Sequence, residues 1–69
     1  MNPLSQQDVI RKFKNLGFEG PRQQGRHPFM SKGPLKVFIE GRHGRDIPIW
    51  LQQKFLRQAG ISKDDWDKA

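Results

Sequence analysis

The chain has 69 residues and no cysteine, so it is long enough for one small domain, and neither disulfides nor thiolate ligands stabilise it. Its net charge is +6, from 13 lysines and arginines against 7 aspartates and glutamates. No apolar run is long enough to span a membrane, and the first residues lack the pattern of a secretion signal. We therefore expect a single cytoplasmic domain, residues 1–69, whose basic surface attracts a polyanion such as nucleic acid.

The first predicted element is an amphipathic helix that begins after Ser5 and ends before Gly17. Ser5 is a typical N-cap, and Asp8 follows three residues later, as in a capping box. The apolar residues recur at the spacing of one helix face, and they are Val9, Phe13 and Leu16. Gly17 is a typical residue after a helix C-terminus, and Phe18 is expected to fold back on the last turn.

Three short strands are expected next, separated by turn residues. Residues 35–40 give the clearest strand, because they are β-branched, aromatic and partly alternating. The sequence SKGP before them is typical of a turn, which makes residues 26–31 the preceding strand of a hairpin. Residues 18–24 are a weaker first strand. Because Pro21 and Pro28 cannot donate to a ladder, we expect both at sheet edges or bulges.

A second helix is predicted between Asp46, which is suited to cap it, and the terminating Gly60, with Pro48 tolerated in the first turn. One apolar face, with two residues beside it, is predicted from the spacing: Leu51, Phe55 and Ala59, flanked by Trp50 and Leu56. A last short helical turn is capped by Ser62 and docks through Trp66. The order α-β-β-β-α predicts an α+β fold with a three-stranded antiparallel sheet and two helices on one face, as in double-stranded-RNA-binding domains.

The tripeptide GRH occurs twice and contains both histidines of the chain, His27 and His43. On the predicted second strand, His27 is suited to move a proton to or from a ribose 2′-hydroxyl. Cations beside it would bind phosphates and stabilise developing negative charge. The cations expected to flank it are Arg22, Arg26, Lys32 and Lys36. On chemistry alone, an ordinary strand histidine is the simpler interpretation.

The remaining candidates are weaker. His43 follows the third strand, where it could protonate a leaving 5′-oxygen or contact a phosphate, although a turn histidine without a role is favoured on chemistry alone. Phe29 and Phe38 could stack on bases, but we expect them in the core because so small a sheet has little else to bury. Two histidines without cysteine do not make a closed zinc site, and no glycine-rich phosphate loop occurs, so we expect no metal and no cofactor.

Two long segments resemble one family. VIRKFKNLGFEGPRQQGRH is similar to the opening of the HicA (YcfA-like) toxins, in which an amphipathic helix is followed by LGF, a basic strand and Gly-Ser-His. VFIEGRHGRDIPIWLQQKFLRQAGIS is similar to that family's later strand, a histidine in the loop after it and a closing helix that ends QAGIS. The resemblance covers residues 5–62, and its most specific parts are LGF, GxH and LRQAGIS in that order.

The resemblance implies a double-stranded-RNA-binding-like fold and a toxin that cleaves mRNA without a metal and is neutralised by a HicB antitoxin. It implies that His27 is the catalytic residue, as general base or acid. The residues expected to bind RNA or assist are Arg22, Arg26, Lys32, Lys36, Arg42, His43 and Arg45. Arg26 replaces the family's serine, and Pro28 replaces a frequent second histidine and removes a backbone donor. A non-catalytic RNA-binding module and a basic protein-interaction domain are the alternatives.

Overall fold

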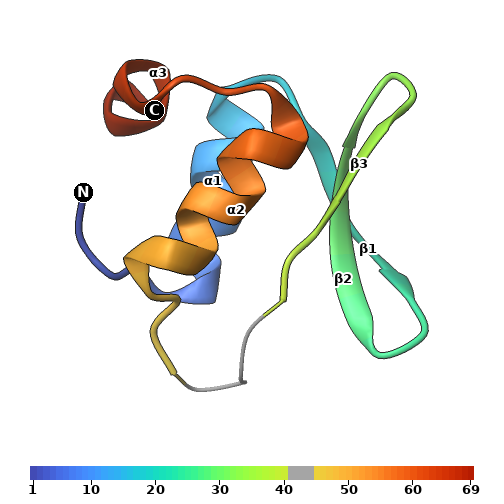
Figure 1. Ribbon diagram of the computed structural model, residues 1–69. Coiled ribbons are helices and arrows are strands. Elements are labelled where there is room, and N and C mark those ends of the chain that lie inside the picture. Colours follow the sequence, from blue (N-terminus) through green and yellow to red (C-terminus); the bar gives the residue numbers. More distant parts are fainter. Residues whose placement is uncertain (41–44) are drawn as a thin grey trace.

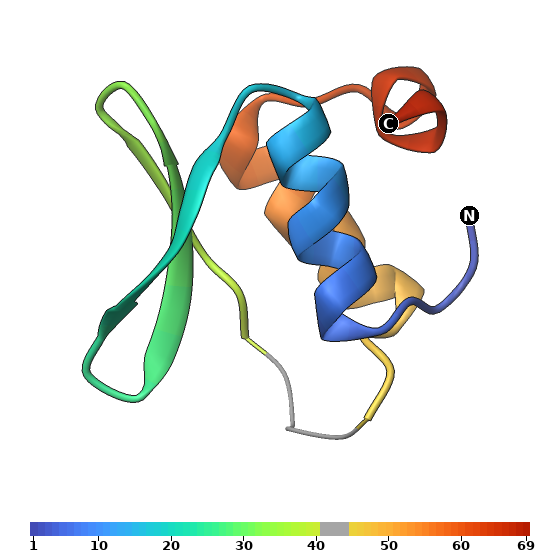
Figure 2. The same cartoon turned by 180° about the vertical axis from the view of Figure 1, so that it is seen from behind.

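The computed structural model of the chain describes residues 1–40 and 45–69. Its elements are α1 (Gln6–Asn15), β1 (Glu19–Gln24), β2 (His27–Lys32), β3 (Leu35–Phe38), α2 (Ile49–Ala59) and α3 (Lys63–Lys68). The helices α1 and α2 lie side by side on one face of the sheet, and α3 lies beyond them, away from the sheet (Figures 1 and 2). The predicted α-β-β-β-α order of an α+β fold is therefore confirmed, and the expected last turn is a six-residue helix.

The predicted caps of the first and last helices are confirmed. The Ser5 hydroxyl accepts a hydrogen bond from the backbone N–H of Asp8 at 3.1 Å, and Ser62 accepts from the N–H of Asp65 at 3.1 Å. These side chains satisfy backbone donors that the first helical turn leaves unpaired. At the other end of α1, the Phe18 N–H donates to the Phe13 carbonyl at 3.0 Å, as its expected return to the last turn requires.

The sheet is antiparallel with the order β1-β2-β3, so β2 is the central strand. Gln24 pairs with His27, which leaves a two-residue loop that begins with Gly25 at a φ of +65°. A tight hairpin loop of this kind favours glycine because its first residue has positive φ. Lys32 pairs with Leu35 across the second hairpin loop.

The two strand prolines occupy different positions. Pro21 lies on the edge strand β1, where the register shifts between Glu19 and Arg22, as predicted. The prediction was wrong for Pro28, which lies in the central strand β2. Its carbonyl accepts a hydrogen bond from the N–H of Ile39 at 2.9 Å, but proline has no N–H to return the bond. The hydrogen bond that proline cannot donate would join it to Ile39, which follows the last residue of β3. Its absence therefore disturbs no pair of the β2–β3 ladder.

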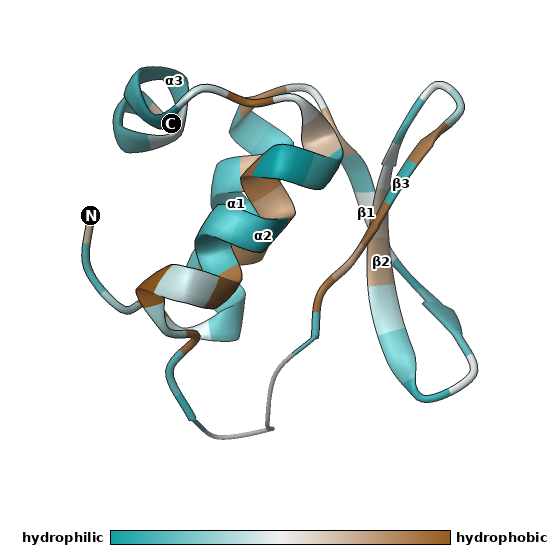
Figure 3. Ribbon diagram, viewed as in Figure 1, coloured by the Kyte–Doolittle hydropathy of each residue, from teal (hydrophilic) through white to brown (hydrophobic). Residues whose placement is uncertain are grey.

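The core lies between the two long helices and the sheet face that they cover. Phe13 stands at its centre, because its ring centroid lies 5.1 Å from that of Phe18, 6.5 Å from that of Phe55 and 5.0 Å from that of Trp66. In the ribbon of Figure 3, most residues of β1 and α3 are hydrophilic, and apolar residues lie in the middle of β2 and β3. The core cluster is Val9, Phe13, Phe18, Met30, Val37, Ile39, Ile47, Leu51, Phe55, Leu56, Ala59 and Trp66.

One polar side chain is completely buried in this core. Gln52 donates from Nε2 to the carbonyl oxygens of Asn2 and Ile47, at 2.7 and 3.1 Å, and its Oε1 accepts from Nε1 of Trp66 at 3.1 Å. Buried polar groups of this kind are stable only when they are hydrogen-bonded. Gln52 thus joins the N-terminal segment, α2 and α3.

The start of α2 differs from the prediction in two ways. Asp46 does not cap it: the N-cap is Pro48 without a side-chain hydrogen bond, because Ile47 is held extended by an antiparallel bridge to Leu4, at 2.6 and 3.1 Å. Trp50 does not lie beside the core, since it is 65% exposed, whereas Leu51 and Leu56 are buried. Of the helices in the described parts of the chain, none is long and apolar enough to cross a membrane.

Candidate functional site

The candidate site lies on the sheet face that the helices leave uncovered. Side chains alternate between the two faces of a strand, and directly opposite residues of antiparallel strands share a face. Met30 and Val37 belong to the core cluster, so their neighbours along β2 and β3 point the other way. We call this surface the open face; its residues are Arg22, Gln24, His27, Phe29, Ser31, Lys36 and Phe38.

His27 is the first residue of β2 and is exposed. It comes directly after the Gly25–Arg26 loop and pairs with Gln24 of β1, so its backbone is fixed by the hairpin while its ring is accessible to a ligand. This is the position at which a strand can present a proton-transfer group without burying it.

Lys36 reaches the same region from β3. Its Nζ lies 3.4 Å from Oε1 of Gln24, the residue paired with His27, and 4.8 Å from the centroid of the Phe29 ring. The ammonium group is therefore held over the open face near the first hairpin. A cation there is well placed to bind a phosphate beside His27.

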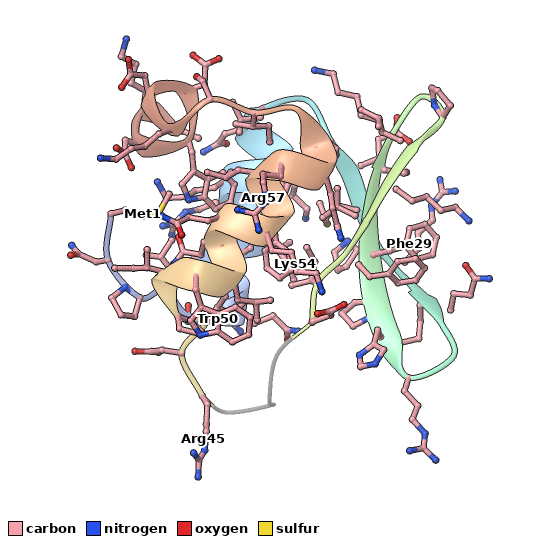
Figure 4. The ribbon with its side chains drawn as sticks, in the orientation of Figure 1. Met1, Phe29, Arg45, Trp50, Lys54 and Arg57 are labelled. Atoms are coloured by element: carbon pink, nitrogen blue, oxygen red, sulfur yellow. The ribbon has the colours of Figure 1, made fainter. Side chains whose placement is uncertain are left out.

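Phe29 and Phe38 form a pair on the open face, with ring centroids 5.6 Å apart. Phe29 is buried, with 8% exposed, but it is not part of the core cluster between helices and sheet. Figure 4 shows its ring on the side of the sheet opposite the helices. Phe29 is thus buried, as predicted, but both rings lie outside the core cluster, because strand alternation puts Met30 and Val37 there instead.

Three of the arginines predicted for the site lie in the described parts of the chain, where they are exposed but spread apart: Arg22, Arg26 and Arg45. Arg22 lies on the open face opposite Phe29, and its Nη2 is 3.8 Å from the carboxylate of the exposed Glu19. Arg26 occupies the tip of the first hairpin, next to His27. Arg45 precedes α2 and points away from the protein in Figure 4. Arg22 and Arg26 are thus brought near His27 by the hairpin itself.

Lys32 does not flank His27, contrary to expectation. It ends β2, five residues along the strand, which corresponds to about 17 Å at the usual rise per residue. Its Nζ donates to the carbonyl of Leu16 at 3.1 Å and lies 5.7 Å from the centroid of the Phe18 ring. Lys32 therefore fastens the end of β2 to the end of α1, and strand alternation places it off the open face.

Arg42 and His43 lie outside the described residues, so their expected roles stay predictions. Between Met1 and Glu40 and between Arg45 and Ala69, no group of three His, Cys, Asp or Glu side chains is arranged to hold a metal ion.

Two contacts near the site were not predicted. Gln24 positions the Lys36 head group, and its role depends on a hairpin register that the sequence leaves open. Glu40 accepts from Nζ of Lys54 at 2.9 and 3.2 Å, which connects the segment just after β3 to α2. Opposite charges 14 residues apart, such as Glu40 and Lys54, leave no local spacing signal in the sequence. The open face could have been located in advance from the alternation of residues along β2.

Comparison with known families gives one finding. Residues 7–61 match the family model described as HicA toxin of bacterial toxin-antitoxin, which covers most of the chain. No curated protein and no solved structure gives a significant match. The matched span includes β1, β2, β3 and α2, and thus the whole open face.

Proposed function

This chain belongs to the HicA toxin family of bacterial toxin–antitoxin systems, and we propose that it is a metal-independent endoribonuclease that cleaves mRNA with His27. Membership in the family implies an antitoxin partner, and we propose a HicB-type protein that covers the open face. The observation that carries the proposal is the position of His27, which is exposed on a fixed hairpin with Lys36 and two arginines nearby. We place its action in the cytoplasm, where mRNA is found.

The proposed reaction is a transfer within the RNA chain. A ribose 2′-oxygen attacks the adjacent phosphorus, the bond from phosphorus to the 5′-oxygen breaks, and the 2′ proton goes to a base. A proton is then delivered to the departing 5′-oxygen, which leaves a 2′,3′-cyclic phosphate and a 5′-hydroxyl. His27 acts in one of these proton transfers, and the Lys36 ammonium stabilises the negative charge on the phosphorus oxygens.

Two neighbours of His27 support this arrangement and also limit it. Arg26 at the hairpin tip adds a cation where the family has serine, so phosphate attraction is kept or strengthened. Pro28 fixes the backbone directly after His27 and has no N–H to offer a phosphate. These departures favour, as a second candidate, an RNA-binding module that has lost catalysis.

The test is cleavage of RNA by the purified chain in EDTA. We expect internal cleavage that leaves 5′-hydroxyl ends, and we expect His27→Ala to lower the rate by at least about a hundredfold, the usual contribution of a positioned acid or base. Gln58→Ala, which changes an exposed polar residue of α2 outside the open face, is the control and should retain most activity. Expression in bacteria should arrest growth for the unmodified chain and not for His27→Ala.

Three results separate the candidates. Equal cleavage by His27→Ala would refute the role of His27, and dependence on a divalent metal would refute the metal-free mechanism. RNA binding that weakens steeply with salt, without any cleavage, would support the non-catalytic module. RNA affinity that does not respond to salt would contradict both and favour a protein-interaction domain.

A further inference from the structure

An exposed tryptophan on α2 lies outside the core cluster of the described residues. Trp50 is 65% exposed, whereas the chain's second tryptophan, Trp66, is 1% exposed and hydrogen-bonded to Gln52. Exposing an indole to this extent forgoes the burial of a large apolar ring, which would stabilise so small a domain. In the parts of the chain that the structure describes, packing and hydrogen bonding therefore give no structural reason for a tryptophan at this position.

Cations accompany Trp50 along the outer face of α2. Lys54 and Arg57 follow it at the i+4 and i+7 positions, and residues at this spacing share one face of a helix. Figure 4 shows the three side chains along the same side of α2, with Arg45 beyond the start of the helix. Lys54 is 40% exposed and paired with Glu40, and Arg57 is exposed. We call Trp50, Lys54 and Arg57 the α2 stripe.

The chemistry of the stripe fits a nucleic acid better than a protein. Its apolar part consists of Trp50 and the neighbouring Ile49, which is only 36% exposed. A stable protein interface needs about 1,000 Å² or more of buried surface with an apolar centre. Stacking of one nucleic-acid base, by contrast, needs only one aromatic ring, because every base has a π-face. Cations beside the ring can bind the phosphates of the same strand.

We propose that Trp50 stacks on an unpaired base of RNA and that the α2 stripe is a second RNA contact apart from His27. This inference rests on RNA being the ligand in the proposed function. The bases of a duplex are stacked on one another and so are closed to Trp50, which means that the stripe selects single-stranded RNA. Trp50 is a positioning residue: it holds the strand while the chemistry takes place on the open face.

The test measures binding rather than cleavage, so that it is independent of His27. The full chain is titrated with a short 2′-O-methyl-uridine oligonucleotide, which lacks the attacking hydroxyl. We expect Trp50→Ala to weaken binding on the order of tenfold, as removal of a stacking ring does, and Trp50→Phe to retain most affinity. Leu35→Ala is the matched control, because Leu35 is an exposed apolar residue, 41% exposed, on the second hairpin.

Two further readouts identify stacking itself. Tryptophan fluorescence should be quenched on binding, and the quenching should vanish in Trp50→Phe, since Trp66 is buried. The salt dependence of binding should be the same in Trp50→Ala and the unmodified chain, because no charge is removed. In cleavage, Trp50→Ala should raise KM and leave kcat unchanged.

Several outcomes would overturn the inference. These are equal loss of affinity in Trp50→Ala and Leu35→Ala, an equal effect of Trp50→Ala on an RNA duplex, and an equal effect on a sugar–phosphate chain without bases. Unchanged RNA binding combined with loss of neutralisation by the co-expressed antitoxin would make Trp50 a protein contact instead. Absence of any cleavage, with the Trp50 effect on binding intact, would refute the proposed catalysis but not the stacking.

Discussion

The buried amide of Gln52 offers the sharpest test of how this small domain is held together. It joins three segments that are distant in sequence, through hydrogen bonds to Asn2, Ile47 and Trp66. Gln52→Met removes all three hydrogen bonds while it keeps an unbranched side chain of similar size. We expect this substitution to destabilise the fold although it adds apolar surface to the core.

The magnitude follows from which partners lose their last hydrogen bond. The Ile47 carbonyl keeps the N–H of Leu4 at 3.1 Å, and Asn2 is exposed, so water can replace its donor. Nε1 of Trp66 has no such substitute, because the residue is 1% exposed. One buried, unsatisfied donor costs about 1–3 kcal/mol. This is a large share of the roughly 3–10 kcal/mol expected for a domain of this size.

Urea unfolding followed by far-UV circular dichroism measures this loss. At a slope near 1 kcal/mol per molar, a loss of about 2 kcal/mol lowers the midpoint by about 2 M urea. Gln58→Met is the matched control, since Gln58 is exposed on the same helix and should change stability by less than about 0.5 kcal/mol. Trp66→Phe removes the unsatisfied donor. The unfolding free energy of the double variant Gln52→Met and Trp66→Phe should therefore fall by about 1 kcal/mol less than the sum of the two single losses.

The reasoning is refuted if Gln52→Met is no less stable than Gln58→Met. It is also refuted if the losses of Gln52→Met and Trp66→Phe simply add, because the hydrogen bond between the two side chains would then contribute nothing measurable.

Two further predictions concern the sheet. Lys36→Gln should weaken single-stranded RNA binding and reduce the slope of log K against log salt by about 0.7, because one phosphate contact is lost. Lys63→Gln on α3 is the control and should change neither quantity. Equal effects of the two substitutions would show that the open face has no special part in binding. In urea unfolding, Gly20→Ala should destabilise the fold by about 1–2 kcal/mol more than Gly25→Ala. Gly20 has a φ of +129°, and a Cβ added there would lie 2.9 Å from the Phe29 carbonyl oxygen, whereas a Cβ at Gly25 would have no atom within 4 Å. Equal losses would contradict the predicted clash.

Features that depend on neighbours in sequence could be predicted well. The N-caps Ser5 and Ser62 act within three residues, and the SKGP turn fixes the hairpin between β2 and β3. The apolar stripe of α1 follows from the 3.6-residue period of a helix. These local patterns, with the resemblance to the HicA toxins, were enough to predict the α-β-β-β-α order and the family before any contact was known.

Features that depend on contacts between distant segments could not be predicted. Asp46 failed as a cap because the bridge between Leu4 and Ile47 keeps the chain extended until Pro48. Lys32 lies outside the candidate site because its head group donates to the carbonyl at the end of α1. In both cases a hydrogen bond between remote segments decided the local outcome.

The sequence by itself determined the elements, their order and the excess of positive charge, since each follows from residue type and short-range spacing. The choice of His27 came from the resemblance to the HicA toxins. The tertiary structure alone decided which face each residue occupies. It placed Lys36 with the neighbour of His27, left Trp50 exposed and buried Gln52. The physical reason is that burial depends on the segments that pack against a residue. Trp50 and Gln52 are two positions apart on one helix, yet the tryptophan is exposed and the glutamine is buried, the reverse of what their residue types favour.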